Sequence, residues 1–453
     1  MAKKSAKECN ERKVDCSERK VDYKENLGFL TGDIVKIKTS KDEFEGTIIP
    51  SHDPSIILLK LSSGYNLGVE KDRIESIKKE GSKKPEQFPE AKEKKTKSDK
   101  PGISIVITGG TISSRLDYNT GAVTPLISPD QLFFLAPKLL ETVKINKIER
   151  PFTLLSENMH PEKWKEIAKI AAELLNKKEN KGIIITHGTD TLHYTSAALS
   201  FMLKNINKPV VLTYSQKSTD RGSTDAVLNL TCSGFAALSD IAEVMLVGHA
   251  SQDDNKCYAI HGTKARKMHT SRRDAFRPIN DIALAEIDSE GQIKVNKEYN
   301  KRDDAKKVIA DTAFEDKIAF LKAYPGADPK ILDYYANEGC RGIIIEATGL
   351  GHVSLEGKYN WIPHIKDAIQ KGITICFAPQ TIYGRLDPYV YSTGRELLEA
   401  GVIFLEDILP ETAYVKLGCV LGHEKDAKKI KALMLQNIAN EFNPKISEDS
   451  FLY

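Results

Sequence analysis

The chain has 453 residues, of which 40% are hydrophobic and 28% are charged, and its formal net charge at pH 7 is +3. This composition is typical of a soluble globular protein, and the length allows about three domains. The small net charge argues against a protein that binds nucleic acid over its whole surface, so any basic contact must be local.

The N-terminal residues are charged and contain no hydrophobic stretch. We therefore expect residues 1–26 to form a charged tail. Nowhere does the chain contain the roughly 20 consecutive apolar residues that cross a bilayer, which favours a cytoplasmic protein without a membrane contact. The seven cysteines lack the spacing of metal ligands, which indicates reduced thiols and no metal site.

Residues 27–78 alternate short apolar runs with turn residues, as in "GDIVKIKT", "FEGTIIPS" and "SIILLKLSSG". This alternation predicts a small all-β barrel of about five strands. The pattern resembles the SH3-like and Sm-like barrels. Such a barrel acts either as an adaptor or as a purely structural appendage, and its residues do not decide between the two.

Residues 79–101 are rich in lysine and contain prolines, with one aromatic residue. A segment of this composition cannot bury enough apolar surface to offset the entropy of ordering, so we expect a linker. Its lysines are suited to contact RNA phosphates. More often such a run is simply solvated.

From residue 102 the pattern changes to apolar strands that alternate with amphipathic helices. Residues 102–290 and 341–453 each show it, with "GISIVIT" and "GIIIT" in the first and "GIIIEATGLGHVS" and "GITICFAPQT" in the second. The charged segment 291–340 is expected to connect them. The sequence thus predicts two doubly wound α/β domains built on parallel sheets.

Two strands of the first domain end in a glycine followed by threonine. Ligands of such folds bind beyond the carboxyl ends of the strands, which places Gly110 with Thr111 and Gly188 with Thr189 in one crevice. Glycine lets backbone N–H groups approach a ligand closely. A threonine hydroxyl is a poor nucleophile at neutral pH, so this chemistry requires a nearby base.

Lys267 is the candidate base, because the arginines around it in "HGTKARKMHTSRRDAF" would favour its uncharged form. Asp190 follows Thr189 and is placed to orient the amine. A lysine beside arginines also fits a phosphate or carboxylate binding site. Those arginines could instead pair with Asp253 and Asp254 of "ASQDD".

The motifs "TGGTI", "HGTDT" and "GTKARKMHTSRRDAF" together resemble the L-asparaginase/glutaminase family of threonine amidohydrolases, over residues 102 to 423. The resemblance implies two asparaginase-like domains behind the small barrel. It also implies Thr111 as the nucleophile and Thr189 as a second catalytic threonine, although spacing does not settle which acts first. The other catalytic residues that it implies are Tyr118 of a closing flap, Asp190 and Lys267.

Substrate binding is implied for four further positions. Ser156 stands where the family has a substrate-binding serine, and Glu157 stands where many members have glutamine. Backbone N–H groups near Gly110 and Gly188 would form an oxyanion hole. Glutamine and asparagine differ by one methylene, a difference worth about 1–3 kcal/mol, so the preferred amide stays open.

Along its full length the chain resembles the family of D subunits of archaeal glutamyl-tRNA(Gln) amidotransferases. This resemblance implies ammonia release from glutamine or asparagine for a separate E subunit, which would bind ATP and Mg²⁺ and amidate Glu-tRNA(Gln). It also implies a homodimer core within a heterotetramer, with no cofactor bound by this chain itself. The alternatives are a free-standing cytoplasmic L-asparaginase/glutaminase and an RNA-binding scaffold built on an inactive fold.

Overall fold

The structure is a computed structural model that describes residues 28–51, 53–63, 65–82, 99–116, 123–125, 137–219 and 223–451. The predicted tail, most of the predicted linker and Tyr118 lie outside these residues. The described residues divide into two compact units, one ending at Ser82 and the other starting at Asp99.

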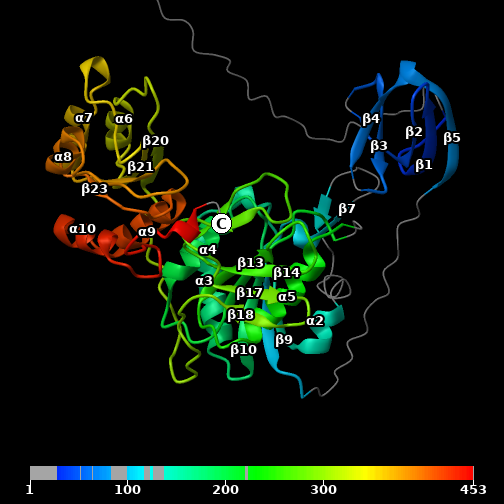
Figure 1. Cartoon of the computed structure of the whole chain (residues 1–453), viewed down its shortest axis with the longest axis horizontal. Coiled ribbons are helices and arrows are strands. Elements are labelled where there is room, and N and C mark those ends of the chain that lie inside the picture. Colours follow the sequence, from blue (N-terminus) through cyan, green and yellow to red (C-terminus); the bar gives the residue numbers. More distant parts are fainter. Residues whose placement is uncertain are drawn as a thin grey trace, which may run out of the picture. The chain divides into compact units, whose positions relative to one another are not determined.

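The first unit is an antiparallel sheet of five strands, drawn in blue in Figure 1. Its order is β4-β3-β2-β1-β5, and alternate residues such as Val35, Ile37 and Leu59 form its core. The strands are β1 (Asp33–Thr39), β2 (Glu43–Ile49), β3 (Ile56–Leu61), β4 (Asn66–Glu70) and β5 (Ile74–Ser82). The predicted all-β fold is confirmed.

Strand β5 continues past the predicted end of the barrel at residue 78. Its lysines suggested a linker, but Lys78 and Lys79 pair with Lys36 and Val35 of β1. The strand lies at the edge of the sheet, where exposed lysines are tolerated and even discourage pairing with other chains.

The second unit begins with an eight-stranded sheet of order β18-β17-β14-β13-β12-β10-β6-β9. The five strands from β13 to β9 run parallel, as predicted, whereas β14, β17 and β18 extend the sheet in antiparallel fashion. The strands are β6 (Gly102–Ile107), β9 (Lys144–Glu149), β10 (Asn180–Thr186), β12 (Val210–Thr213), β13 (Val244–His249), β14 (Lys256–His261), β17 (Ala285–Asp288) and β18 (Ile293–Val295).

Helices cover both faces of this sheet (Figure 1). On one face α3 and α4 pack against alternate residues such as Val106, Ile183 and Ile185. On the other face α5 and α2 pack against Ile105 and Ile184. The helices are α2 (Pro137–Thr142), α3 (Pro161–Leu175), α4 (Leu192–Met202) and α5 (Ala226–Leu238).

A second, four-stranded parallel sheet has the order β20-β21-β22-β23. Its first strand lies within the predicted connection 291–340, because a strand of five residues between charged segments gives little periodic signal. The strands are β20 (Ile318–Lys322), β21 (Gly342–Ala347), β22 (Thr374–Pro379) and β23 (Ile403–Phe404). Its helices are α6 (Ile331–Asn337), α7 (Ile362–Gln370), α8 (Ser392–Glu399), α9 (Pro410–His423) and α10 (Ala427–Leu435).

Short strand pairs complete the second unit. They are β7 (Ser114–Leu116) with β8 (Val123–Pro125), β11 (Leu203–Lys204) with β19 (Ile309–Ala310), and β15 (Ala265–Lys267) with β16 (Phe276–Pro278). Of these, the β15–β16 hairpin carries Lys267 and therefore positions a predicted site residue. Among the helices that the structure describes, none is both long and apolar enough to span a membrane.

Candidate active site

Three loops pack closely against one another beyond the carboxyl ends of β6 and β10, and glycines allow this close packing. A Cβ on Gly110 would lie 2.4 Å from the backbone of Gly188, and a Cβ on Gly188 would lie 2.7 Å from the side chain of Ser156. Gly109, with φ of +114°, forms a parallel bridge to Leu154. The backbones therefore approach one another more closely than any other residue type would allow.

Half-buried Thr111 directly follows the first glycine pair and opens a short 3-10 helix over Thr111–Ser113. Because Gly110 and Gly188 are in contact, the two Gly-Thr junctions of the sequence are brought together. Tyr118, which was predicted to close over the site, lies outside the described residues.

Lys267 reaches the second of these junctions. Its Nζ donates to Thr189 Oγ1 at 2.9 Å and to Asp190 Oδ1 at 2.7 Å. The lysine side chain is 12% exposed, whereas that of Asp190 is 61% exposed. Thr189, Asp190 and Lys267 thus form one contact group, although 77 residues separate the aspartate from the lysine.

The arginines around Lys267 in sequence all face carboxylates. Arg266 pairs with Glu411 at 3.2 Å, and Arg272 pairs with Asp274 at 2.9 Å. We expected these arginines to surround the lysine with uncompensated positive charge. The structure shows that their charge is compensated, because each guanidinium extends to an acid on another segment or in its own loop.

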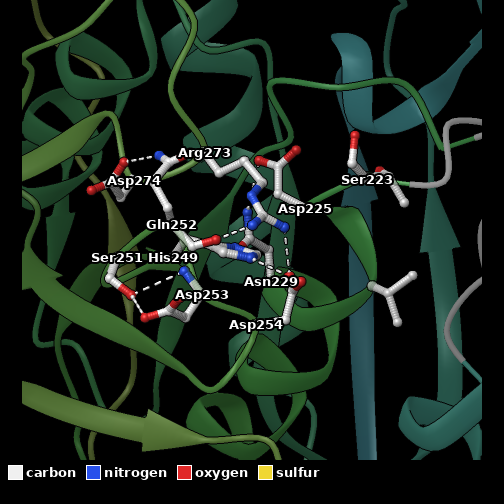
Figure 2. A network of polar contacts seen from close by, with 12 residues as sticks. Ser223, Asp225, Asn229, His249, Ser251, Gln252, Asp253, Asp254, Arg273 and Asp274 are labelled. Atoms are coloured by element: carbon white, nitrogen blue, oxygen red, sulfur yellow. Dashed lines mark hydrogen bonds and ion pairs between the residues drawn. The ribbon is translucent and has the colours of Figure 1, made fainter. Parts of the chain in front are cut away.

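Arg273 belongs to a polar network at the carboxyl end of β13 (Figure 2). It pairs with Asp254 at 2.7 Å, as the alternative interpretation of this segment predicted. Asp254 also contacts His249 Nε2 at 3.0 Å, and Asn229 of α5 contacts His249 Nδ1 at 2.6 Å. The network fastens the loop after β15 to the main sheet. Asp253, the other predicted partner, contacts Ser251 instead.

The two predicted substrate-binding side chains differ in exposure. Ser156 is 4% exposed, and its Oγ accepts a hydrogen bond from the backbone N–H of Asp190 at 3.1 Å. Its carbonyl accepts from Thr191 Oγ1 at 2.6 Å. Glu157 is exposed on the same loop. Ser156 therefore connects its own loop to the loop that carries Asp190 and Thr191, and it lies beside the candidate site.

A buried chain of hydrogen bonds beneath the site was not anticipated from sequence. Trp164 Nε1 donates to Thr195 Oγ1 at 3.0 Å, and that hydroxyl lies 2.9 Å from His187 Nε2. His187 Nδ1 lies 2.7 Å from the carbonyl oxygen of Gly188. Burial lowers the pKa of His187 to about 4, so its ring is neutral at neutral pH. The spacing of "HGTDTLHYT" places His187 and Thr195 near one helix end, which is the only sequence signal for this chain of contacts.

Comparisons with known proteins divide the chain in a similar way. Residues 102–301 match the family model "Asparaginase, N-terminal", and residues 317–434 match the "Glutaminase/Asparaginase C-terminal domain". Residues 29–79 match the "GatD N-terminal domain". The D subunit of the glutamyl-tRNA(Gln) amidotransferase of Thermococcus kodakarensis is 45% identical over 98% of this chain and 100% of its own length. The chain belongs to this D-subunit family.

A second relative supports the assignment. The corresponding protein of Pyrococcus furiosus is also 45% identical, over 94% of this chain and 98% of its own length. The similarity that we inferred from motifs to the amidotransferase D subunits is confirmed.

Solved structures share the fold of the second unit. The thermostable L-asparaginase from Thermococcus kodakarensis is 30% identical, with a TM-score of 0.69 over 76% of this chain and 100% of its own. L-asparaginase I from Vibrio cholerae is 26% identical, with a TM-score of 0.64 over 76% of this chain and 99% of its own. The predicted pair of asparaginase-like domains is confirmed.

Proposed function

We propose that the chain hydrolyses the side-chain amide of glutamine or asparagine and supplies the ammonia for conversion of Glu-tRNA(Gln) to Gln-tRNA(Gln). The similarity to D subunits carries this proposal, because it extends over the N-terminal barrel as well as the two asparaginase-like domains. The contact group of Thr189, Asp190 and Lys267 provides chemistry that fits such a reaction.

In the proposed reaction Thr111 attacks the carboxamide carbon. The new C–O bond gives a tetrahedral intermediate whose oxyanion would be held by backbone N–H groups near Gly110 and Gly188. The proton that the Thr111 hydroxyl loses on attack is passed to the amide nitrogen, the C–N bond breaks, and ammonia leaves. Tyr118 would close on the substrate and assist this threonine.

Water completes the cycle by hydrolysing the acyl-threonine ester. A proton acceptor is needed to activate the water, and Lys267 is suited to this role when uncharged because it already contacts Thr189. Asp190 orients the amine, and Ser156 with Glu157 would hold the polar end of the amino acid. The ester C–O bond breaks, and the acid product leaves with the threonine hydroxyl restored.

The remaining part of the reaction belongs to a partner. The relatives are themselves subunits of a larger enzyme, which implies a second polypeptide. We assign to this E subunit the ATP and Mg²⁺ that amidation of Glu-tRNA(Gln) requires, with no cofactor held by the present chain. The proposed assembly has a homodimer of this chain at its centre and works in the cytoplasm, where tRNA is charged.

The alternative of a free-standing asparaginase is less well supported. The similar L-asparaginase structures span 76% of this chain, whereas the amidotransferase relative from Thermococcus kodakarensis spans 98%. An inactive RNA-binding scaffold has no need for a lysine seated between a threonine and an aspartate. The match over nearly the full chain therefore argues against the free-standing asparaginase, and the lysine contacts argue against the inactive scaffold.

An ammonia-release assay tests the proposal. With the E subunit, ATP, Mg²⁺ and Glu-tRNA(Gln), the full chain should support formation of Gln-tRNA(Gln) from glutamine. Thr111→Ala should abolish this synthesis, and added ammonium chloride should restore it, because the partner's step stays intact. An equal rate of amide hydrolysis with and without charged tRNA and partner would instead indicate the free-standing enzyme.

A further inference from the structure

The loop that follows β12 lies beside the candidate site, and the proposed reaction gives it no role. We call residues 214–219 the β12 loop. Strands β12 and β10 are neighbours in the sheet, and the backbone N–H of His187 donates to the carbonyl of Thr213 at 3.0 Å. The β12 loop therefore begins beside the junction of Gly188 and Thr189, at the edge where ligands of such sheets bind.

The β12 loop also contacts the hairpin that carries Lys267. The ring centroids of Tyr214 and Phe276 lie 4.6 Å apart, and Phe276 pairs with Lys267 across the hairpin. The hydroxyl of Tyr214 donates to the carbonyl of Arg273 at 2.8 Å. The β12 loop is thus adjacent to both elements whose side chains meet at the site, namely the loop of Thr189 and the strand of Lys267.

A buried carboxylate fixes the backbone of the β12 loop. Asp225 accepts from the backbone N–H of Gln216 at 2.9 Å and from that of Lys217 at 3.0 Å. It also accepts from the hydroxyl of Ser215 at 2.8 Å. Hydrogen bonds to a charged acceptor are strong, so they hold the loop in one conformation. Gln216 is therefore preorganised for binding.

Two side chains of the β12 loop end in buried polar atoms. Gln216 Nε2 and Ser218 Oγ are buried without a hydrogen-bond partner among the residues that the structure describes. Lys217, which lies between them, differs because its Nζ donates to Ser223 Oγ at 2.8 Å. Buried polar groups are nearly always hydrogen-bonded, since an unpaired one loses its bonds to water without replacement. Unpaired groups at the edge of a candidate site therefore indicate a ligand.

A glutamine at the edge of the second sheet shows the opposite behaviour. Gln380 directly follows β22, and its Nε2 donates to the carbonyl of Ala323, which follows β20. Gln216 and Gln380 thus share their residue type and their place beyond the end of a parallel strand. The protein itself satisfies the donor of Gln380. The corresponding donor of Gln216 is left for a bound molecule.

We propose that Gln216 is a further substrate-binding residue, whose Nε2 donates a hydrogen bond to an oxygen of the bound glutamine or asparagine. The inference rests on the proposed function, which places an amino acid amide at this edge of the sheet. The carboxamide oxygen and the α-carboxylate of such a ligand are both acceptors that match this donor. The β12 loop then forms the wall opposite the loop of Thr111, because β12 and β6 flank β10.

A binding measurement tests this contact directly. Gln216→Met keeps nearly the same shape but removes the donor. Thr111→Ala serves as the background, because it removes the proposed nucleophile and lets calorimetry measure the dissociation constant of intact glutamine. In the full chain, adding Gln216→Met to Thr111→Ala should weaken glutamine binding about 10-fold. Equal dissociation constants in the two proteins would overturn the proposal.

Thermal melts separate this role from a structural one. Because Nε2 has no partner among the described residues, Gln216→Met should leave the melting temperature unchanged or raise it. Gln380→Met is the matched control, since it removes a hydrogen bond that the protein makes. It should lower the melting temperature and leave the KM for glutamine unchanged. An equally large fall in Gln216→Met would show that its donor has a protein partner, which overturns the proposal.

Steady-state ammonia release from the full chain then identifies the oxygen. A KM raised about 10-fold with kcat retained assigns the hydrogen bond to the α-carboxylate, which is held alike throughout the reaction. A lowered kcat assigns it to the carboxamide oxygen, where negative charge develops. Unchanged values of both constants would overturn the proposal.

Gln216→Asn repeats the test if Gln216→Met does not fold. It retains the amide but shortens its reach by one methylene, so it should also weaken glutamine binding, and unweakened binding would overturn the proposal. An unsubstituted chain that releases ammonia from neither amide would refute the proposed function itself. Ammonia release that Gln216→Met leaves unaffected would refute only the role of Gln216.

Discussion

The two sheets of the second unit end in similar loops but offer different chemistry. Strands β6 and β10 lead into glycines that press against neighbouring loops and bring Thr111 and Thr189 together. Strand β21 also leads into a loop with a threonine and glycines. There the backbone N–H and the side chain of Thr348 both donate to the carbonyl of His352, at 3.0 and 2.9 Å, so the turn closes on itself.

This contrast shows that a small-residue loop after a strand does not make a site by itself. The first edge differs because Lys267 arrives from a distant hairpin and contacts Thr189. The second domain instead supports the segment that carries Lys267, because Asp407 pairs with Lys264 and Glu411 pairs with Arg266. Substitutions at either edge and changes of pH test this contrast.

Removal of Lys267 is expected to have the largest effect, because it takes the proposed base from the first edge. Lys267→Met should lower kcat for ammonia release by about 10²- to 10⁴-fold and leave the fold intact. Lys256→Met is the control, since Lys256 forms a surface ion pair with Glu286 at 2.6 Å. A steady-state glutaminase assay and a thermal melt measure both variants. Comparable rates of ammonia release in Lys267→Met and Lys256→Met would contradict the proposed role of Lys267.

Loss of Asp407 tests the supporting role of the second domain. Asp407→Asn leaves Lys264 buried without its partner, and neither side chain of the pair is more than 2% exposed. We expect the unfolding free energy to fall by about 3–5 kcal/mol. Combining it with Lys264→Met should recover most of the loss, as measured by urea denaturation.

The pH dependence of the Asp407→Asn variant follows from the same burial. Desolvation lowers the pKa of Lys264, so the unfolded state binds more protons than the folded state as pH approaches the ordinary lysine value. The stability of the single variant should therefore rise with pH up to about 10. A stability that falls over this range would contradict the buried placement of Lys264.

Acid should destabilise the first α/β domain through three buried histidines. Burial lowers the pKa of His187 and His261 to about 4 and that of His193 to about 3. The unfolded chain takes up these protons below about pH 6.5, so stability is complete above that value and declines toward pH 4. Each histidine should lower the free energy of unfolding by about 2 kcal/mol when the pH has fallen to about 5. Chemical denaturation across this pH range measures the loss of unfolding free energy. In His187→Gln this loss should be about one third smaller than in the unsubstituted chain.

The smallest expected effect concerns the close packing of the loops. Gly188→Ala places a Cβ 2.7 Å from Ser156, which should displace the second junction and lower kcat/KM by about 10-fold. Gly372→Ala is the control in the second domain. Gly372 has φ of +85° and no atom within 4 Å of an added Cβ, so this variant should lose only about 1 kcal/mol of stability. Equal activity in both would show that close approach at Gly188 is unnecessary.

Local patterns predicted the strands and the loops of the site because they depend on neighbouring residues. The run from residue 102 to Thr108 is buried on both faces, as expected for a strand covered by helices on each side. The antiparallel strands β14, β17 and β18 were not predicted, and β14 pairs with β17 although residues 262–284 lie between them. Glu411 gave no signal at all, because 145 residues separate it from Arg266.

Sequence patterns predicted the all-β N-terminal unit, the two α/β domains and the Gly-Thr junctions, and they indicated Lys267 as a candidate base. Tertiary structure alone decided that Lys267 reaches Thr189 and Asp190, that the arginines beside it are matched with acids, and that α9 holds the opposite face of β15. This difference arises because strand periodicity and glycine conformation depend on residues only a few positions apart in the chain. Ion pairs and close backbone contacts depend on which distant segments the packed core brings together.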